Sequence, residues 1–395
     1  MRVLLTTYGT RGDVEPLVAL AVELRALGAD VRMCTPPDEE FAHRLDGLGI
    51  EAVAAGPPVR ALMRATAPPT AAELTKYRAE LLETQFDVLP AAAAGCDALV
   101  AAGLAQVAAR SVAEAAGVRY FYATYAAVNL PSPHHAPPPR PGWPEPSGAD
   151  NAALWKFDAR QVNAQFREPL NAHRDALGLP PVDNVRDHVY SDRPWLAADP
   201  VLGPPPPGLE VVRTGGWTLP DDRPLPAELT AFLAAGPPPV YVGFGSITPA
   251  PDIARWSVEV ARARGHRVLV SRGWAELAVD GCFAVGEVNH QRLFGELAAV
   301  VHHGGAGTTQ TAARAGVPQL VVPIRLADNP YWAGQVAAHR IGAALDGPTA
   351  TPDSVTAAFD TALAPGTRAR AKALGPRMRT DGAKAAARRL LDELR

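Results

Sequence analysis

The sequence has few cysteines, little net charge and no long apolar run. Cys34, Cys96 and Cys282 are scattered and form no CxxC pair, so we expect reduced, buried thiols. The formal net charge of -3 gives no reason to expect nucleic acid or an anionic membrane as a partner. Neutral ligands or small anions fit this composition better.

Targeting and membrane signals are also lacking. The opening "MRVLLTT" has no long apolar segment and no cleavage site, and no apolar run approaches the roughly 20 residues that span a bilayer. We therefore expect a cytoplasmic protein without stable membrane association. Nothing in the sequence demands more than a monomer.

The order of apolar patterns indicates the fold class. A chain of 395 residues is too long for one ordinary core, and short apolar runs alternate with amphipathic helical patterns along most of it. The strand–turn–helix opening at 2–28 recurs at 238–265. This pattern predicts an α/β protein with two Rossmann-like parallel-sheet domains that face one another across a cleft. We predict an N-terminal domain over 1–202, a Pro-rich linker over 203–226, a C-terminal domain over 227–375 and a terminal helix over 376–395.

Two irregular segments interrupt the alternation in the first half of the chain. Proline removes backbone donors and prevents regular structure in "PSPHHAPPPRPGWPEPSG" at 131–148, and a smaller Pro-rich stretch covers 54–70. A loop of this length inside a domain is either disordered or functional. The same choice applies to the shorter segment at 54–70.

The segment "AAVVHHGGAGTTQTAARAGVPQLVVP" at 298–323 places a glycine-rich turn between a buried strand and a helix. Its glycines let backbone approach a ligand, and the first helical turn presents unpaired N–H groups with partial positive charge. The pattern predicts an anion site suited to a diphosphate, although it is neither GxGxxG nor GxxxxGK[ST]. The alternative is a tight turn with capping threonines.

A carboxylate stands at the matching point of the first strand, in "VLLTTYGTRGDVEP" at 3–16. At a strand's carboxyl end, Asp13 could act as a general base. It could equally serve as an N-cap of the helix that follows. Local sequence leaves the two interpretations open.

Several motifs together resemble GT-B fold glycosyltransferases of family 1. "HHGGAGTT", "GVPQLVVP" and "ADNPYWA" are similar to their donor-binding signature, and "YGTRGDVEPLVALA" resembles the opening of the antibiotic and sterol branch. "VYVGFGSI", "LVSRGWAEL", "VGEVNHQRLF" and "RPWLAADPVLGP" resemble the enzymes that glycosylate vancomycin-type glycopeptides. The resemblance implies inverting transfer of a hexose or deoxyhexose from a dTDP- or UDP-sugar, held by the second domain, to a hydroxyl of a glycopeptide aglycone or pseudoaglycone in antibiotic biosynthesis.

The resemblance also assigns the reacting groups. It favours Asp13 as the base, and because no His lies in 1–42, a lone carboxylate is simpler than a His–Asp pair. No DxD metal motif occurs, so we expect neither a metal nor another cofactor, with the turn dipoles stabilising the departing diphosphate. Arg11 could orient Asp13 or meet a phosphate, or it could be a solvated turn residue. The predicted diphosphate-binding residues are Thr10, Arg11, Gly12, Ser246, His303, Gly304, Gly305, Ala306, Gly307 and Thr308.

Two further groups of residues are expected to hold the rest of the donor. Arg272, Gly273 and Trp274 would bind the nucleoside together with the backbone of Val288 and Asn289, with the indole stacking on the base; the alternative for Trp274 is core packing. Asp328 and Asn329 would bind the sugar. In relatives the second position is usually Gln, and Asp328 could instead be an N-cap or a second candidate base.

Three rival functions remain open at this point. A sterol or lipid glucosyltransferase would keep the fold, but no basic amphipathic helix is visible to bring it to a membrane. A non-catalytic sugar-nucleotide binding protein would not need Asp13 beside an intact anion turn. A sugar-nucleotide epimerase would convert its donor without any acceptor.

Overall fold

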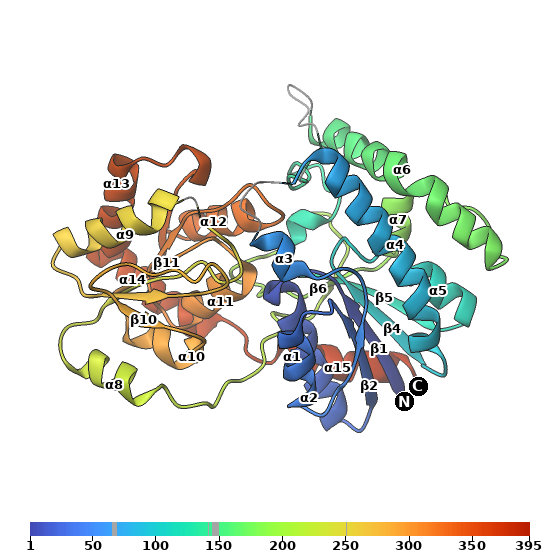
Figure 1. Cartoon of the computed structure of the whole chain (residues 1–395), viewed down its shortest axis with the longest axis horizontal. Coiled ribbons are helices and arrows are strands. Elements are labelled where there is room, and N and C mark those ends of the chain that lie inside the picture. Colours follow the sequence, from blue (N-terminus) through green and yellow to red (C-terminus); the bar gives the residue numbers. More distant parts are fainter. Residues whose placement is uncertain (65–68, 141, 144–149, 250) are drawn as a thin grey trace. The chain divides into compact units, whose positions relative to one another are not determined.

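Two parallel β-sheets organise the chain (Figure 1). The computed structural model describes residues 1–64, 69–140, 142–143, 150–249 and 251–395. Unit 1 comprises Met1–Pro200, Pro204–Leu219 and Arg379–Arg395, whereas unit 2 comprises Val201–Gly203 and Pro220–Met378. Each unit holds one sheet, and this confirms the prediction of two parallel-sheet α/β domains.

The sheet of unit 1 has seven strands among the described residues, in the order β3-β2-β1-β4-β5-β6-β7, and all pairings are parallel. The order changes direction between β1 and β4, which makes the ends of these strands the switch point of the sheet. The strands are β1 (Arg2–Thr7), β2 (Asp30–Thr35), β3 (Glu51–Ala54), β4 (Ala98–Ala102), β5 (Arg119–Thr124), β6 (Trp195–Leu196) and β7 (Val212–Arg213).

The helices of unit 1 follow from amphipathic patterns and end signals. The first helix begins after Thr10 and buries Val14, Leu17 and Val18 against the sheet. The helices are α1 (Arg11–Ala26), α2 (Glu39–Asp46), α3 (Val59–Met63), α4 (Ala71–Ala93), α5 (Ala109–Ala116), η1 (Ala127–Asn129), α6 (Asn151–Ala176), α7 (Val185–Tyr190) and α15 (Gly382–Glu393).

The C-terminal helix belongs to unit 1, where α15 packs against α1. The buried carboxylate of Asp199 accepts a hydrogen bond of 2.7 Å from the backbone nitrogen of Arg379, just before this helix. A β-carbon at Gly382 would lie 2.3 Å from the carbonyl oxygen of Gly216, so the helix begins in direct contact with that backbone. The segment 203–226, expected to be a linker, also contains β7, which pairs with β6.

Unit 2 contains a six-stranded parallel sheet, counted over the residues described, in the order β10-β9-β8-β11-β12-β13. Its switch point lies between β8 and β11. The strands are β8 (Val240–Val242), β9 (Val268–Ser271), β10 (Phe283–Val285), β11 (Ala299–His302), β12 (Gln319–Val321) and β13 (Gly342–Ala344).

The faces of this second sheet are covered by two apolar clusters. One contains Val242, Val301 and Phe359, and the other contains Tyr241, Val300 and Phe294, so alternate residues of β8 and β11 enter opposite cores. Strands buried on both faces are typical of parallel sheets. The helices of unit 2 are α8 (Ala227–Ala234), α9 (Pro251–Ala263), α10 (His290–Leu293), η2 (Phe294–Glu296), α11 (Ala306–Arg314), α12 (Asn329–Ala338), η3 (Gly347–Thr349), α13 (Pro352–Leu363), α14 (Pro365–Leu374) and η4 (Gly375–Arg377).

The long helices α4 and α6 are not membrane spans. Across the part of the chain that the structure describes, no helix combines the length and the apolarity that crossing a bilayer requires.

Candidate active site

Asp13 occupies the first turn of α1, directly after the strand at the switch point of unit 1. Its Oδ2 accepts a hydrogen bond of 2.8 Å from the backbone nitrogen of Thr10. The N-cap of the helix is Thr10 and not Asp13, but Asp13, at position N3, is the reciprocal partner of Thr10 in a capping box and so contributes to capping. This bond fixes the orientation of the side chain.

Glycines leave room around this carboxylate. A β-carbon at Gly9, after β1, would lie 2.1 Å from Oδ2 of Asp13, and one at Gly103, after β4, would lie 3.9 Å from Oδ1. Tyr125, at the end of β5, donates a hydrogen bond of 2.9 Å to the carbonyl oxygen of Asp13. The ends of three strands thus define the position of one acidic residue.

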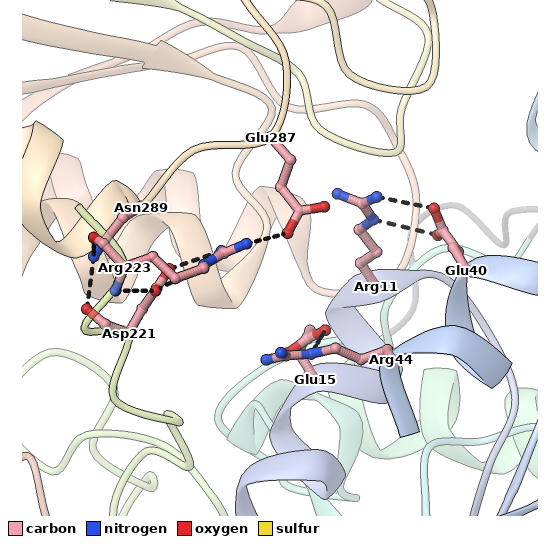
Figure 2. Close-up of polar contacts among 8 residues, drawn as sticks. All are labelled: Arg11, Glu15, Glu40, Arg44, Asp221, Arg223, Glu287 and Asn289. Carbon is pink, nitrogen blue, oxygen red and sulfur yellow. Dashed lines mark hydrogen bonds and ion pairs between the residues drawn. The ribbon is translucent and has the colours of Figure 1, made fainter. Parts of the chain in front are cut away.

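Arg11 is fixed to the neighbouring helix α2. Its guanidinium makes a two-point ion pair with Glu40, at 3.2 and 2.9 Å, and one turn further along α1 Glu15 pairs in the same way with Arg44 (Figure 2). The Arg11 side chain is 41% exposed, so this pair contributes little stability and mainly orients α2. Thr10, Arg11 and Gly12 all belong to unit 1.

The glycine-rich turn of unit 2 joins β11 to α11 as predicted. Gly304 has a left-handed backbone (φ 90°), and its β-carbon would lie 2.9 Å from the carbonyl oxygen of Asn329, so glycine is required there. Gly305 is the N-cap of α11, whose first turn contains Ala306, Gly307 and Thr308. The backbone N–H groups at this helix start have no intrahelical acceptor and favour an anion.

The imidazole ring of His302 holds the glycine-rich turn in place. Its Nδ1 accepts from the backbone nitrogen of Gly304 at 3.1 Å, so Nε2 carries the proton and donates to Oε1 of Gln319 at 2.9 Å. Gln319 in turn donates to the carbonyl oxygen of Thr309 at 3.3 Å. Burial, helped by the neighbouring His303, lowers the pKa of His302 to about 3. The ring is therefore neutral at pH 7 and sets the geometry of the turn.

His303 lies between the two loops at the switch point of unit 2. A β-carbon at Gly305 would lie 2.6 Å from its Nε2, and one at Gly245, after β8, would lie 3.5 Å from its Cε1. Burial lowers the pKa of His303 to about 4. Its buried Nδ1 has no hydrogen-bond partner among the described residues. Ser246 is buried beside Gly245, so the predicted diphosphate residues of unit 2 gather at one place.

The predicted nucleoside residues follow the adjacent strands β9 and β10. Trp274 donates its backbone N–H to the carbonyl oxygen of Gly245 at 2.8 Å, which joins this loop to the loop that follows β8. Its side chain is only 3% exposed, so the indole offers little surface for stacking and core packing accounts for its environment. Arg272 is exposed, and Gly273 has a left-handed backbone (φ 57°) packed against Gly245.

Val288 and Asn289 lie in the loop after β10, and Asn289 anchors the chain that enters unit 2. Its side-chain nitrogen donates to the carbonyl oxygens of Asp221 and Arg223, at 2.6 and 2.8 Å (Figure 2). Its side-chain oxygen caps α10. Arg223 also pairs with Glu287 at 3.2 Å. The side chain of Asn289 is thus structural, and its backbone remains the group proposed to meet a base.

The pair Asp328 and Asn329 begins α12. Asp328 occupies the N-cap position but makes no capping bond; its Oδ2 accepts from Nε1 of Trp332 at 2.8 Å instead. Burial raises the pKa of Asp328, and the indole bond opposes that shift. The amide nitrogen of the buried Asn329 donates to the carbonyl oxygen of His303 at 3.1 Å. Asn329 therefore ties α12 to the anion turn, a role that sequence did not predict.

Two other positioning residues were missed. Gln319 was hidden in the apolar run "GVPQLVVP", where a single polar residue in a buried strand is the signal that could have revealed it. Tyr125 gave no signal, because its partner Asp13 lies 112 residues away. Within the described ranges, no group of three or more His, Cys, Asp or Glu side chains is arranged to hold a metal ion.

Comparison with known proteins agrees with this geometry. Residues 3–131 match the sequence model of the glycosyltransferase family 28 N-terminal domain, and residues 278–386 match that of the erythromycin biosynthesis protein CIII-like C-terminal domain. The chain is 53% identical over 402 residues to vancomycin aglycone glucosyltransferase of Amycolatopsis orientalis, covering 99% of this chain and 97% of that protein. It is 50% identical over 386 residues to dTDP-epi-vancosaminyltransferase of the same organism, covering 94% and 92%.

A solved structure of the glycotransferase of kitacinnamycin shares the fold, with a TM-score of 0.74, 19% identity and coverage of 100% of this chain and 98% of that one. The two parallel-sheet units and these matches define a glycosyltransferase of the GT-B fold. Within that class, the chain belongs to the vancomycin group of glycopeptide glycosyltransferases. The resemblance seen in the sequence motifs is confirmed.

Proposed function

We propose that this protein is an inverting glycosyltransferase of antibiotic biosynthesis that transfers a hexose or deoxyhexose from a dTDP- or UDP-sugar to a hydroxyl of a glycopeptide aglycone or pseudoaglycone. The names of the two relatives, one acting on the vancomycin aglycone and one using a dTDP-sugar, support this substrate class. Identity of about half over nearly the whole chain supports a shared acceptor class more than a shared sugar.

The position of Asp13 carries the proposal. One oxygen of its carboxylate is held by the nitrogen of Thr10 at the switch point of unit 1. In the proposed step the acceptor oxygen attacks the anomeric carbon and its proton passes to Asp13. The bond from that carbon to the diphosphate oxygen breaks, and the nucleoside diphosphate leaves with the electron pair. General-base assistance of this kind contributes typically about 10²- to 10⁴-fold.

The start of α11 is the proposed site of the leaving diphosphate. Its unpaired backbone N–H groups would stabilise the negative charge, and the neutral His303 ring would add a hydrogen bond. We propose that this arrangement works without a metal ion or other cofactor. Asp328 and Asn329 would bind the sugar, with Asp328 oriented by Trp332.

The loops 54–70 and 131–148 of unit 1 are the proposed acceptor wall. Residues 65–68, 141 and 144–148 lie outside the described residues. The described part of the first loop contains α3, and the proline content of both segments limits the entropy lost when a bulky acceptor is bound.

Replacing Asp13 by Asn tests the base. Asparagine keeps an oxygen that can accept from Thr10, so the start of α1 should persist, but it cannot take up a proton. We expect turnover to fall at least about 10²-fold with nearly unchanged nucleotide affinity, measured by initial rates and calorimetry. Unchanged turnover would remove Asp13 from the mechanism.

Mass spectrometry of the enzyme incubated with a panel of dTDP- and UDP-sugars and a glycopeptide aglycone tests the reaction itself. The expected product is the aglycone plus one sugar residue, with inverted anomeric configuration by NMR. Donor conversion without acceptor would instead indicate an epimerase. The same assay with a chelator should proceed at the same rate, whereas loss of activity restored by magnesium would refute the metal-independent proposal.

A further inference from the structure

Tyr8 links the strand that precedes Asp13 to the described part of the proposed acceptor wall. It follows β1 directly and is only 7% exposed. Its neighbour Gly9 contacts the carboxylate of Asp13, and the next residue, Thr10, donates the hydrogen bond that holds it. A displacement of Tyr8 would therefore move the turn of residues 9–13, which contains Asp13, because only two peptide bonds separate Tyr8 from Thr10.

The phenol of Tyr8 makes two hydrogen bonds. Its hydroxyl donates to the carbonyl oxygen of Pro57 at 2.6 Å, in the loop between β3 and α3. Since that carbonyl can only accept, the proton of Tyr8 is used there, and the hydroxyl of Tyr77 on α4 must donate to the oxygen of Tyr8. Burial raises the pKa of both phenols, so both remain protonated donors at neutral pH.

The loop that receives this bond is fixed at two further points. Gly56 has a left-handed backbone (φ 91°), and a β-carbon there would lie 2.5 Å from Cε2 of Tyr8, so the loop lies directly on the ring. The carboxylate of Asp38, after β2, accepts from the backbone nitrogens of Val59 and Arg60 at 2.8 and 2.9 Å. The start of α3 is thus held by the ends of β1 and β2.

We propose that Tyr8 is a positioning residue: it holds residues 55–64, which belong to the first loop of the acceptor wall, and Tyr77 on α4 at a fixed position relative to the carboxylate of Asp13. The proposal rests on the proposed function, because it assumes that this wall binds the acceptor. Tyr8 would act on acceptor affinity and on the choice of hydroxyl, and it would leave the donor site in unit 2 untouched.

The test uses Tyr8→Phe in the full-length enzyme, with Tyr120→Phe as the matched control. Tyr120 also donates from a half-buried position in unit 1 to a backbone carbonyl, that of Val189 at 2.8 Å, and Val189 belongs neither to the wall segments nor to the turn of residues 9–13. For Tyr8→Phe we expect the acceptor KM to rise about tenfold or more and a second regioisomer to appear, since displacements of about 1 Å can cost 10²-fold. Donor KM should stay within about twofold for both variants.

Hydrogen–deuterium exchange provides a readout that does not depend on activity. Tyr8→Phe should speed exchange in peptides covering 57–63, whereas Tyr120→Phe should speed it only near Val189. Tyr77→Phe, which removes one of the two bonds, should give a smaller change in the same peptides.

Equal exchange in both tyrosine variants, or equal acceptor KM with a single regioisomer, would overturn the inference. If the wild-type enzyme modified no acceptor but Tyr8→Phe still sped exchange in residues 57–63, the proposed function would be wrong. The anchoring of this loop by Tyr8 would nevertheless be supported.

Discussion

The carboxylate of Asp13 occupies the place where a side chain at Gly9 would stand. A β-carbon added at Gly9 would lie 2.1 Å from Oδ2 and 2.4 Å from Cγ of Asp13. The glycine at this position thus makes room for the proposed base and leaves the N–H of Thr10 within 2.8 Å of it. The requirement is steric and can be tested without altering Asp13 itself.

Gly9→Ala should displace the carboxylate and break its bond to Thr10. We expect turnover to fall about 10²-fold while nucleotide affinity in unit 2 stays constant, measured by initial rates and calorimetry. Gly117→Ala is the control, because Gly117 is also left-handed (φ 65°) but has nothing within 4 Å of an added β-carbon. It should lose about 1–2 kcal/mol of stability with normal turnover. Equal turnover in the two variants would contradict the steric argument.

Trp332→Phe should weaken sugar binding through Asp328. The variant removes the indole bond that lowers the carboxyl pKa, so this pKa should rise further and the side chain should lose its orientation. Hydrogen bonds to charged groups contribute about 1.5–3 kcal/mol, so we expect donor KM to rise about tenfold or more. Affinity for the nucleoside diphosphate alone should change little. Trp256→Phe on α9 serves as the control and should leave both constants unaltered.

His302 should make the stability of unit 2 depend on pH. Its folded pKa of about 3 lies below the ordinary value of 6.5, so the unfolded chain binds one more proton between these values. The stabilisation is complete above pH 6.5 and is lost as the pH falls toward 3. His302→Gln should reduce the slope of unfolding free energy against pH in this window by up to about 1.4 kcal/mol per pH unit, measured by denaturant titration. An unchanged slope would show that His302 titrates normally.

Asn289→Ala should release the chain at Asp221 and Arg223 and remove the cap of α10. Loss of an N-cap costs about 0.5–2 kcal/mol, so unfolding measurements should detect it. Because Val288 and Asn289 share a loop, we also expect nucleotide affinity to fall severalfold. Asn184→Ala removes a comparable cap from α7 in unit 1 and should lower stability alone. Matching nucleotide affinities in the two variants would separate this loop from donor binding.

The strands and the anion turn could be predicted because their signals are local. Apolar runs and glycines lie next to one another in the sequence, and β1, β11 and the turn at Gly304 appear where the pattern placed them. Helix α6 is harder to recognise from its sequence, because its buried residues include Asp158 and Arg174. Ion pairs with partners elsewhere in the chain, among them Arg140 for Asp158 and Glu114 for Arg174, allow these charges to be buried, and such partners cannot be read from the pattern of the helix itself.

The side-chain network around the site could not be predicted from local sequence either, because its members are distant from one another in the chain. His302 and Gln319 meet because β11 and β12 are adjacent and in register, which pairs His302 with Val321. Trp274 followed a strand and a glycine, as a stacking residue would, yet it is buried. The sequence thus placed these residues on loops at the ends of strands, whereas their individual partners depended on the tertiary fold.

The return of α15 to unit 1 decides how the protein can be divided. A recombinant fragment ending at Leu219 would leave the apolar face of α1 without the helix that covers it, and Asp199 without the nitrogen of Arg379. Unit 1 produced alone would therefore need residues 379–395 joined to its end. Exchange of unit 2 between related enzymes should accordingly use two crossover points, near residues 219 and 379.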